Sequence, residues 1–562
     1  MDSSAADAGA MQPIAELDTR TKVLVIAGTL LGLFTAAMDQ TIVATSIPKI
    51  VADLGGFGLF AWVGTGFLLA STTTVPIVGR LSDMYGRKPF FMLGIILLLL
   101  GSALAGSSQT IEQLIAFRVL QGFGAGMIMA IAFTIVGDVF PPAERGRWMG
   151  LMAGVFAAAS VLGPLIGGTL TDHADWRWVF YINLPMGGVA LALLAFGMPR
   201  LRPPTTPKMD YRGIVLLCAT TVPMLLAFSW AGNRFDWISP QIIGLLVWSA
   251  AALALLVYTE LHTEEPLLPM QLLKNRVFTV SGTVALLTGF AMMGSLFYIP
   301  LFVQGVLGAS ATNSGLVTMP MMIAMALAAG IAGQIMSRVG KYRVIGVVGL
   351  IVMVIGMAIL STVDASSSRG QLTLAMIIFG IGLGTSIPLY TLAVQNSVPY
   401  RVMGVSTSTM QFLRSVGGTM GVAIMFSVIQ VQYHDGVEEN VPAVVREQEQ
   451  FAQALEDPQF LLNPQALEQV ESAFADFGVA GQVLFVETMT GVRESLAAGV
   501  SQSFFIAIWV LCLAVVAGAF LKDEPLRKTH LTAEEEARPA IGAERAMPPL
   551  AGAATGDDPE AT

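Results

Sequence analysis

The chain has 562 residues, of which 54% are hydrophobic and 12% charged, and its net charge is −9. Soluble globular domains carry about 25% charged residues, so this composition argues against an ordinary soluble protein. Many acidic residues lie in the segment 430–500 and beyond residue 522, outside the apolar segments. No basic patch with interleaved aromatic residues suggests binding to nucleic acid. Composition therefore predicts a membrane protein.

The apolar segments are long and nearly free of charge; 23–37, 90–105 and 242–256 contain no charged residue. A helix of about 20 apolar residues spans the hydrocarbon core of a bilayer. The first segment is not a cleaved signal peptide, because Asp2 and Asp7 precede it and it is too long for the apolar region of one. We predict membrane spans at residues 23–47, 58–79, 89–107, 113–136, 148–170, 178–198, 212–231, 241–260, 277–303, 314–337, 344–362, 372–394, 404–429 and 501–521.

The distribution of basic residues tests this set of spans, because loops on the cytoplasmic side of a membrane are enriched in Lys and Arg. With fourteen spans and a cytoplasmic N-terminus, most basic residues fall on the cytoplasmic side. The short outer loops hold only Lys49, Arg177, Arg234 and Arg369. We therefore predict a multi-pass protein of the cell (inner) membrane with both termini in the cytoplasm.

The one long segment between spans is 430–500, which is rich in Glu, Gln and Ala. Apolar residues recur at helical spacing at Phe451 and Leu455, and again at Leu467, Val470 and Phe474. This pattern predicts short amphipathic helices that lie on the outer surface. The tail 522–562 is rich in Ala, Pro and Glu without an apolar period, which predicts disorder.

Four short motifs of the first half recur in the same order in the second half. Residues 79–88 are echoed by 333–343, Gly122–Gly126 by Gly380–Gly384, 142–146 by 398–404, and 163–168 by 417–421. The repeat predicts an N-terminal six-helix bundle at 23–198 and a C-terminal bundle at 277–521, with two inserted helices at 212–260 and a short N-terminal segment at 1–22. Parallel repeats of this kind occur in transporters that bind their substrate near the bilayer midplane.

Several motifs carry a resemblance to a known family. They read Gly79-x-Leu81-x-Asp83-x-x-Gly86-Arg87-Lys88, Arg118-x-x-Gln121-Gly122-x-Gly124-Ala125, Gly163-Pro164-x-x-Gly167-Gly168, Met38-Asp39-Gln40-Thr41-Ile42-Val43, and Trp176-Arg177-Trp178 followed by Asn183-x-Pro185. Together they resemble the major facilitator superfamily, and within it the fourteen-span drug:proton antiporter branch (EmrB/QacA-like). The resemblance covers residues 20–522. It implies an all-α fold of two six-helix bundles plus two inserted helices, and proton-driven export by alternating access.

Asp39 is the residue with the strongest chemical argument of its own. A charged carboxylate inside a span costs about 2.5–3.5 kcal/mol on insertion scales, and such groups commonly mark proton or ion pathways. We expect Asp39 to couple transport to protons or to attract a cationic substrate; the alternative is an interhelical hydrogen bond. The resemblance implies that Arg118 of the fourth span pairs with a polar group of the first span, whereas the plain alternative is an interfacial side chain. Arg414 has no acidic partner in the membrane spans of the second half.

The motif between the second and third spans predicts a conformational latch formed by Gly79, Asp83, Gly86, Arg87 and Lys88. Gly86 permits a tight turn, and the Asp83 carboxylate can accept hydrogen bonds from a helix N-terminus or an arginine. Anchoring of the chain by positive charge explains Arg87 and Lys88 equally well, but it does not explain Asp83.

The fifth span carries the antiporter motif Gly163, Pro164, Gly167 and Gly168, with Ala159 in place of a further glycine. Small residues at fourfold spacing allow close helix packing, and the family resemblance implies that this packing tightens the contact between the two halves. For the substrate cavity we expect Gln40, Gln121, Met292, Met319 and Met322, because methionines form an adaptable apolar surface; an alternative is that some of the methionines face lipid.

The sequence predicts no cofactor, no metal site and no enzymatic activity. No Walker-type phosphate loop, catalytic triad or metal-ligand spacing is present, and the two cysteines, Cys218 and Cys512, lie within apolar spans. The expected partners are a small-molecule substrate, protons and the lipid bilayer, for a monomeric exporter of lipophilic or cationic molecules. A lipid or metabolite exporter, an uptake symporter and a membrane sensor are the alternatives.

Overall fold

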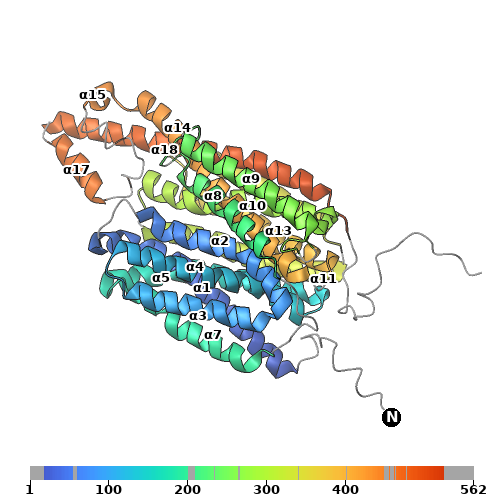
Figure 1. The fold of residues 1–562 in the computed structure, drawn as a ribbon. Helices are drawn as coiled ribbons and strands as arrows, with labels where there is room; N and C mark the ends of the chain where they lie inside the picture. Colours follow the sequence, from blue (N-terminus) through green and yellow to red (C-terminus); the bar gives the residue numbers. More distant parts are fainter. Residues whose placement is uncertain are drawn as a thin grey trace, which may run out of the picture.

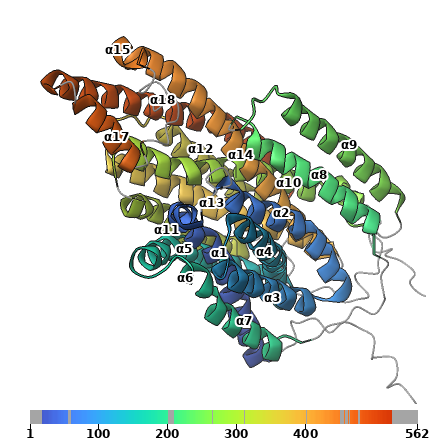
Figure 2. The ribbon, with the colours of Figure 1, turned by 60° about the vertical axis from the view of Figure 1, so that its left-hand side comes forward.

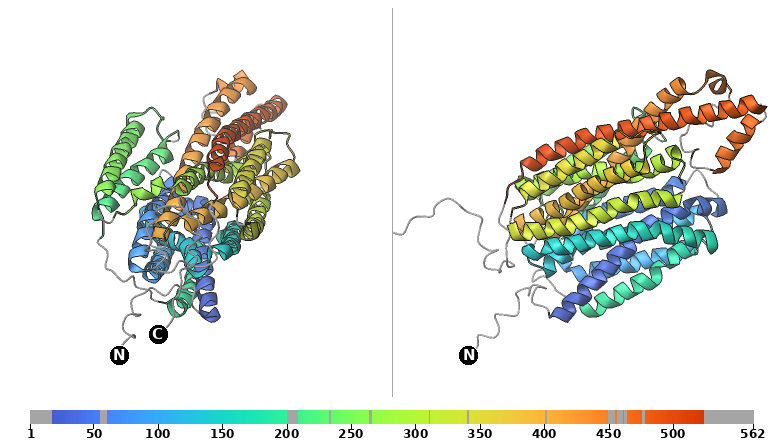
Figure 3. Two further views of the ribbon diagram at one scale, coloured as in Figure 1. Left: turned by 90° about the vertical axis from the view of Figure 1, so that its right-hand side faces the viewer. Right: turned by 180° about the vertical axis from the view of Figure 1, so that it is seen from behind.

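The computed structural model describes residues 18–54, 60–199, 209–232, 234–263, 266–309, 311–339, 341–399, 402–448, 455, 461, 464–475 and 478–523. Within these ranges the regular structure is helical, and no β-strand is formed. Fourteen helices are long and apolar enough to cross a membrane, which confirms the predicted number of spans. Because the number is even, α1 begins and α18 ends at the same end of the helix array (Figure 3).

The N-terminal bundle contains the first six membrane crossings, the last of which is broken into two helices. Its helices are α1 (Thr19–Leu54), α2 (Phe60–Tyr85), α3 (Arg87–Gly106), α4 (Ile111–Val139), α5 (Pro142–His173), α6 (Trp178–Tyr181) and α7 (Asn183–Gly197). They lie side by side in blue and cyan in Figure 1. Leu33, Phe91, Ile131 and Leu194 are fully buried in the core that joins α1, α3, α4 and α7.

The C-terminal bundle repeats the arrangement with six further crossings. They are α10 (Arg276–Leu301, extended by the π-helical turn η4, Phe302–Val306), α11 (Ala311–Val339), α12 (Arg343–Leu360), α13 (Arg369–Ser397), α14 (Met403–Asn440) and α18 (Gly478–Ala519). Its core contains Phe302, Leu350, Phe379 and Phe504, all fully buried. The two bundles meet along α2 and α14 and along α5 and α11.

Two inserted helices connect the bundles, as the repeat predicted. They are α8 (Tyr211–Trp230) and α9 (Pro240–His262), followed by the 3-10 turn η3 (Met270–Lys274). Asp210 caps α8, and Ser239 caps α9 with Pro240 in its first turn, so both starts are encoded locally. The pair forms a hairpin (the green helices in Figure 2) that lies at the flank of the array and contacts α2 and α14 through α8.

The segment 430–500 differs from the prediction of short helices that lie on the surface. Instead α14 and α18 continue through much of it as uninterrupted helices that project beyond the other spans, as Figure 3 shows. Among the described residues of this segment, α15 (Ala443–Arg446) and α17 (Pro464–Ala475) are short helices. Val470 and Phe474 of α17 are buried, and the Phe474 ring lies 5.7 Å from that of Phe485 in α18. Phe451 lies outside the described residues.

Candidate functional site

The Asp39 carboxylate lies at the centre of a buried polar network in the N-terminal bundle. Asp39 is on α1 and is completely buried. Arg118 of α4, only 2% exposed, donates from Nη1 to Asp39 Oδ2 at 2.5 Å. The guanidinium also lies 4.3 Å from the centre of the Phe67 ring of α2. An ion pair inside the membrane therefore joins α1 to α4 and is covered by α2.

Two amides hold the second carboxylate oxygen. Gln121 and Asn183 donate to Asp39 Oδ1 from their side-chain nitrogens at 2.9 and 2.6 Å. Both amides also donate to the Ser102 hydroxyl of α3, at 2.7 and 3.1 Å. Five buried side chains from α1, α3, α4 and α7 thus form one network. Each hydrogen bond is worth more in a low dielectric than in water, and each is costly to leave unmade.

The partners of the Asp39 carboxylate balance its charge and satisfy its oxygens. Arg118 supplies the opposite charge, and Arg118, Gln121 and Asn183 all donate hydrogen bonds to it. A proton added to Oδ2 would remove the negative charge with which Arg118 pairs. The carboxylate therefore joins α1 to α4 and α7 through its charge.

A second polar cluster lies at the end of the array that contains residues 79–88, 144–147, 341–343 and 402–405; this end is called the basic end. Asp83 of α2 accepts hydrogen bonds from the backbone N–H groups of Gly404 and Val405, at 3.0 and 2.7 Å. These groups belong to the first turn of α14, where the helix dipole favours a negative charge. One carboxylate therefore joins the N-terminal bundle to the C-terminal bundle.

Arg87 completes the cluster. It pairs with Asp83 Oδ1 at 2.5 Å and with Asp138 Oδ2 of α4 at 3.0 Å, and it donates to the Ser82 hydroxyl at 2.8 Å. Gly86, just before α3, has a φ of 95°, which favours glycine, so the turn that aims Arg87 depends on this residue.

Two glycines bring α2 and α14 together at this cluster. A side chain on Gly79 would collide with Ser408 of α14, and a side chain on Gly404 would collide with Asp83. A second close approach joins α5 and α11, where a Cβ on Gly146 would lie 2.7 Å from Gly333 Cα. Lys88 acts elsewhere: its ammonium donates to the carbonyls of Ala195 and Met198 at the end of α7, within its own bundle. The basic end is closed in this conformation.

The antiporter motif of α5 packs differently from the expectation. The face with Ala159 and Gly163 contacts α1 of the same bundle: Thr41 donates to the Ala159 carbonyl at 3.1 Å, and a side chain on Gly163 would collide with Thr41. A Cβ on Gly168 would meet nothing within 4 Å. Contact with the other bundle is made on a different side of α5 by Gly146 and Gly150, whose Cβ positions would lie 2.7 Å from the Cα atoms of Gly333 and Gly330. The motif thus positions α1 beside α5, close to Asp39.

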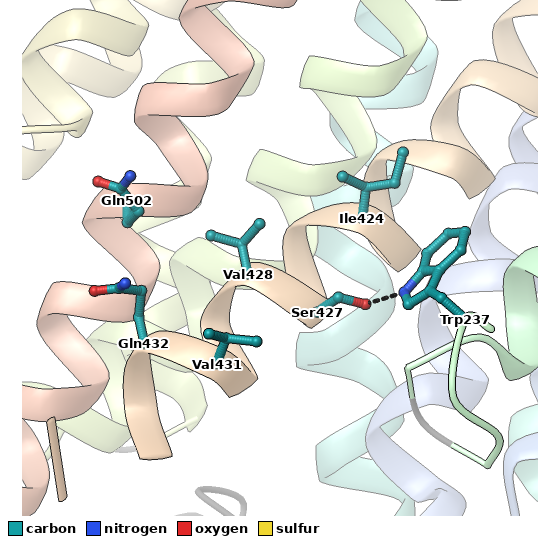
Figure 4. Close-up of a pocket in the computed structure, with 7 residues that line it drawn as sticks. All are labelled: Trp237, Ile424, Ser427, Val428, Val431, Gln432 and Gln502. Carbon is teal, nitrogen blue, oxygen red and sulfur yellow. Dashed lines mark hydrogen bonds between the residues drawn. The ribbon is translucent and has the colours of Figure 1, made fainter. Parts of the chain in front are cut away.

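The residues expected in the substrate cavity fall into two groups. Gln121 is completely buried in the Asp39 network, and Met322 is 8% exposed, whereas Gln40, Met292 and Met319 are half-buried. None of them lines the cavity of about 400 Å³ shown in Figure 4. That cavity lies between α14, α18 and the α8–α9 connection, where the Trp237 indole donates to the Ser427 hydroxyl at 2.6 Å.

Sequence reasoning missed several members of these clusters. Ser102 carries no motif signal, because a serine inside an apolar helix is common. Asn183 could have been found as a polar residue in the predicted span 178–198, and it stands in a motif used for the family resemblance. Asp138 lies two residues beyond the predicted span 113–136, although α4 continues to Val139. The backbone donors of residues 404 and 405 have no signature in side-chain identity. The start of a predicted span near residue 403 was the one feature of the sequence that indicated free backbone N–H groups there.

A single chain with fourteen membrane-spanning helices, a two-bundle fold and a buried ion pair has the architecture of a multi-pass membrane transporter. Residues 29–422 match the family model described as Major Facilitator Superfamily, and the chain belongs to this superfamily of transporters.

The relatives and solved structures agree with this membership. The "Multidrug transporter protein MdtP" of Bacillus subtilis (strain 168) is 34% identical over 529 residues, covering 92% of this chain and 95% of that protein. "Multidrug resistance protein 3" of the same organism is 36% identical over 507 residues, with 90% and 96% covered. The human organic anion transporter MFSD10 superposes with a TM-score of 0.57 at 15% identity, covering 87% of this chain and 99% of that one. At this identity, the comparison with MFSD10 shows a similar fold and nothing about function.

Proposed function

We propose that this protein exports lipophilic or cationic small molecules in exchange for protons by alternating access. The proposal is carried by the buried Asp39–Arg118 pair, whose Nη1–Oδ2 distance is 2.5 Å. Relatives named as multidrug transporters, which align over nine-tenths of the chain, support the class of substrate.

In the proposed mechanism, Asp39 is the proton acceptor. A proton that reaches Asp39 from the end opposite the basic end binds at Oδ2, and Arg118 loses its counter-charge. A cationic substrate near the carboxylate competes with that proton for the same negative charge. Proton and substrate thus bind in turn, which is the requirement for exchange. Asp39 is two residues from Thr41, whose hydroxyl donates to a carbonyl of α5. A movement of α1 that follows the loss of the Asp39–Arg118 ion pair therefore also changes the contact between α1 and α5.

The cluster of Asp83, Arg87 and Gly404 serves as the latch of the basic end in this proposal. Its carboxylate and its α14 donors come from different bundles, so the contact exists only while that end is closed. When the bundles rock to open it, Asp83 must exchange these donors for water. The latch therefore changes the free energy of the closed conformation relative to the open one, and it does so without contacting the substrate site.

We further infer that the protein works as a monomer in the cell (inner) membrane with the basic end and both termini in the cytoplasm. Arg87, Arg145, Lys341 and Arg343 gather at the basic end, as the enrichment of positive charge in cytoplasmic loops requires. Labelling of single cysteines at Lys341 and Asp364 with a membrane-impermeant reagent in intact cells tests the orientation. Reaction at 364 and protection at 341 is expected; the reverse would contradict the proposal.

The proposed function is tested by transport into inverted membrane vesicles with an imposed pH gradient, acid inside. Cationic dyes, neutral amphiphiles and lipids form the panel, and Asp39→Asn is compared with the exposed control Asp364→Asn. We expect accumulation driven by the gradient in the native chain and the control, and none in Asp39→Asn. Movement of substrate together with protons would point to a symporter. Absence of gradient-driven movement across the whole panel would overturn the proposal.

A further inference from the structure

The inserted hairpin contains two acidic groups that the proposed mechanism does not use. Asp210 is the residue that caps α8, and Glu260 lies in the last turn of α9, where it is 3% exposed. Asp210 Oδ1 accepts the N–H of Gly213 at 2.8 Å, and Glu260 Oε2 accepts the N–H of Leu268 at 3.1 Å. One oxygen of each carboxyl group is therefore bonded to backbone.

The other oxygen of each group has no donor. Asp210 Oδ2 and Glu260 Oε1 are both shielded from solvent and make no hydrogen bond. They converge on one point: a Cβ built on Gly213 would lie 2.6 Å from Asp210 Oδ2 and 2.7 Å from Glu260 Oε1. Two carboxylate oxygens that lie this close to one point repel when both are ionised, whereas a proton on one of them supplies a hydrogen-bond donor.

The charges around Asp210 and Glu260 also favour one bound proton. Arg80 of α2 is the cation that acts on Glu260, its Nε is buried without a hydrogen bond, and it forms no ion pair within 4 Å among the described residues. Lys274 of η3, His262 of α9 and Arg212 of α8 are exposed. Among the buried charged groups that the structure describes here, two carboxylates and one guanidinium leave a net charge of −1, and one proton brings them to neutrality.

The surroundings are apolar, which makes a net charge costly there. Ile77 of α2, Leu217 of α8, Leu256 of α9 and Leu267 form one cluster beside these groups. A buried, uncompensated charge is avoided by taking up or losing a proton. The described residues contain no group of three or more His, Cys, Asp or Glu side chains placed to hold a metal ion. The proton is therefore the ligand that fits.

We propose that Asp210 and Glu260 form a second proton-binding site, in which one proton is shared between Glu260 Oε1 and Asp210 Oδ2. When this proton leaves, two carboxylates repel each other where the start of α8 meets the end of α9, both of which belong to the hairpin. Arg80 directly follows Gly79 of the latch cluster, so the site links the protonation of the hairpin to the basic end. The site does not depend on the proposed direction or substrate of transport.

The direct test is infrared difference spectroscopy of the purified chain in lipid, recorded as pH is raised. The native chain is compared with Glu260→Gln, Asp210→Asn and the exposed control Glu144→Gln. Asparagine caps a helix as well as aspartate does, so Asp210→Asn is expected to fold. We expect a carbonyl band of a protonated carboxylic acid that disappears at alkaline pH. It should be absent in Glu260→Gln, shifted in Asp210→Asn and unchanged in the control. Identical acid bands in the native chain and Glu260→Gln would show that Glu260 is ionised and would overturn the proposal.

Discussion

Substitution of Asp83 by asparagine tests the contact that closes the basic end. The carboxylate accepts two backbone N–H groups of α14, at 3.0 and 2.7 Å, and pairs with Arg87 at 2.5 Å. Asparagine keeps the shape but offers one acceptor oxygen, and its amide group faces a donor. Hydrogen bonds to charged groups contribute about 1.5–3 kcal/mol each, and charge at a partly buried helix N-terminus contributes up to about 2 kcal/mol.

Only the closed conformation contains these contacts, so their loss is not shared by the open one. A net loss of about 2 kcal/mol shifts the ratio of closed to open by about 30-fold. We expect a slower transport cycle with an unchanged amount of protein in the membrane. Spin labels at the exposed positions Tyr85 and Lys341, in a chain that lacks Cys218 and Cys512, measure the separation of the two bundles at the basic end.

The expected result is a population of longer distances in Asp83→Asn that is minor in the native chain. Asp364→Asn serves as the control, because Asp364 is exposed and bonds only to Ser366 and Ser367 of its own loop. An unchanged distance distribution, or a loss of membrane protein as large as the loss of transport, would refute the reasoning.

Three further substitutions test other contacts. Asp39→Asn should lower stability by about 3–5 kcal/mol, because Arg118 stays buried without its counter-charge; adding Arg118→Gln should restore part of the melting temperature, and no restoration would contradict the pairing. Asn183→Ala removes one donor to the carboxylate and should cost about 1.5–3 kcal/mol in thermal unfolding, whereas a neutral effect would mean that the hydrogen bond is dispensable. Gly146→Leu places a side chain where a Cβ would lie 2.7 Å from Gly333 Cα, so the same spin-label pair should report an open basic end; the native distance would show that α5 and α11 can absorb the bulk.

The fold was predictable because a bilayer imposes one length and one charge rule on every span. Apolar length and the alternation of basic loops were sufficient for fourteen crossings. The extension of α14 to Asn440 was not predictable in this way. Hydropathy falls where the hydrocarbon ends, but a helix can continue into water through polar residues such as Gln430, Gln432 and Glu438, and hydropathy does not detect that continuation.

The chemistry of single residues was predictable only in part. Asp39 could be singled out from the sequence, because an acidic residue within a membrane span is costly and therefore rare. Its partners could not be identified in this way: Arg118, Gln121 and Asn183 lie 79, 82 and 144 residues away along the chain. Their convergence on Asp39 depends on how α1, α4 and α7 are rotated about their axes. The sequence predicted that Asp83 could accept hydrogen bonds from a helix N-terminus. It did not predict that this helix is α14, which belongs to the other bundle.

The most direct test of the account is whether protons and substrate move in opposite directions through the purified chain. The protein is reconstituted into liposomes with the membrane potential clamped to zero, and a gradient of a transported dye is imposed with no initial pH gradient. The account predicts that dye movement drives protons the other way, and that Asp39→Asn moves dye without protons. Protons that move with the dye, or dye movement without protons in the native chain, would contradict it.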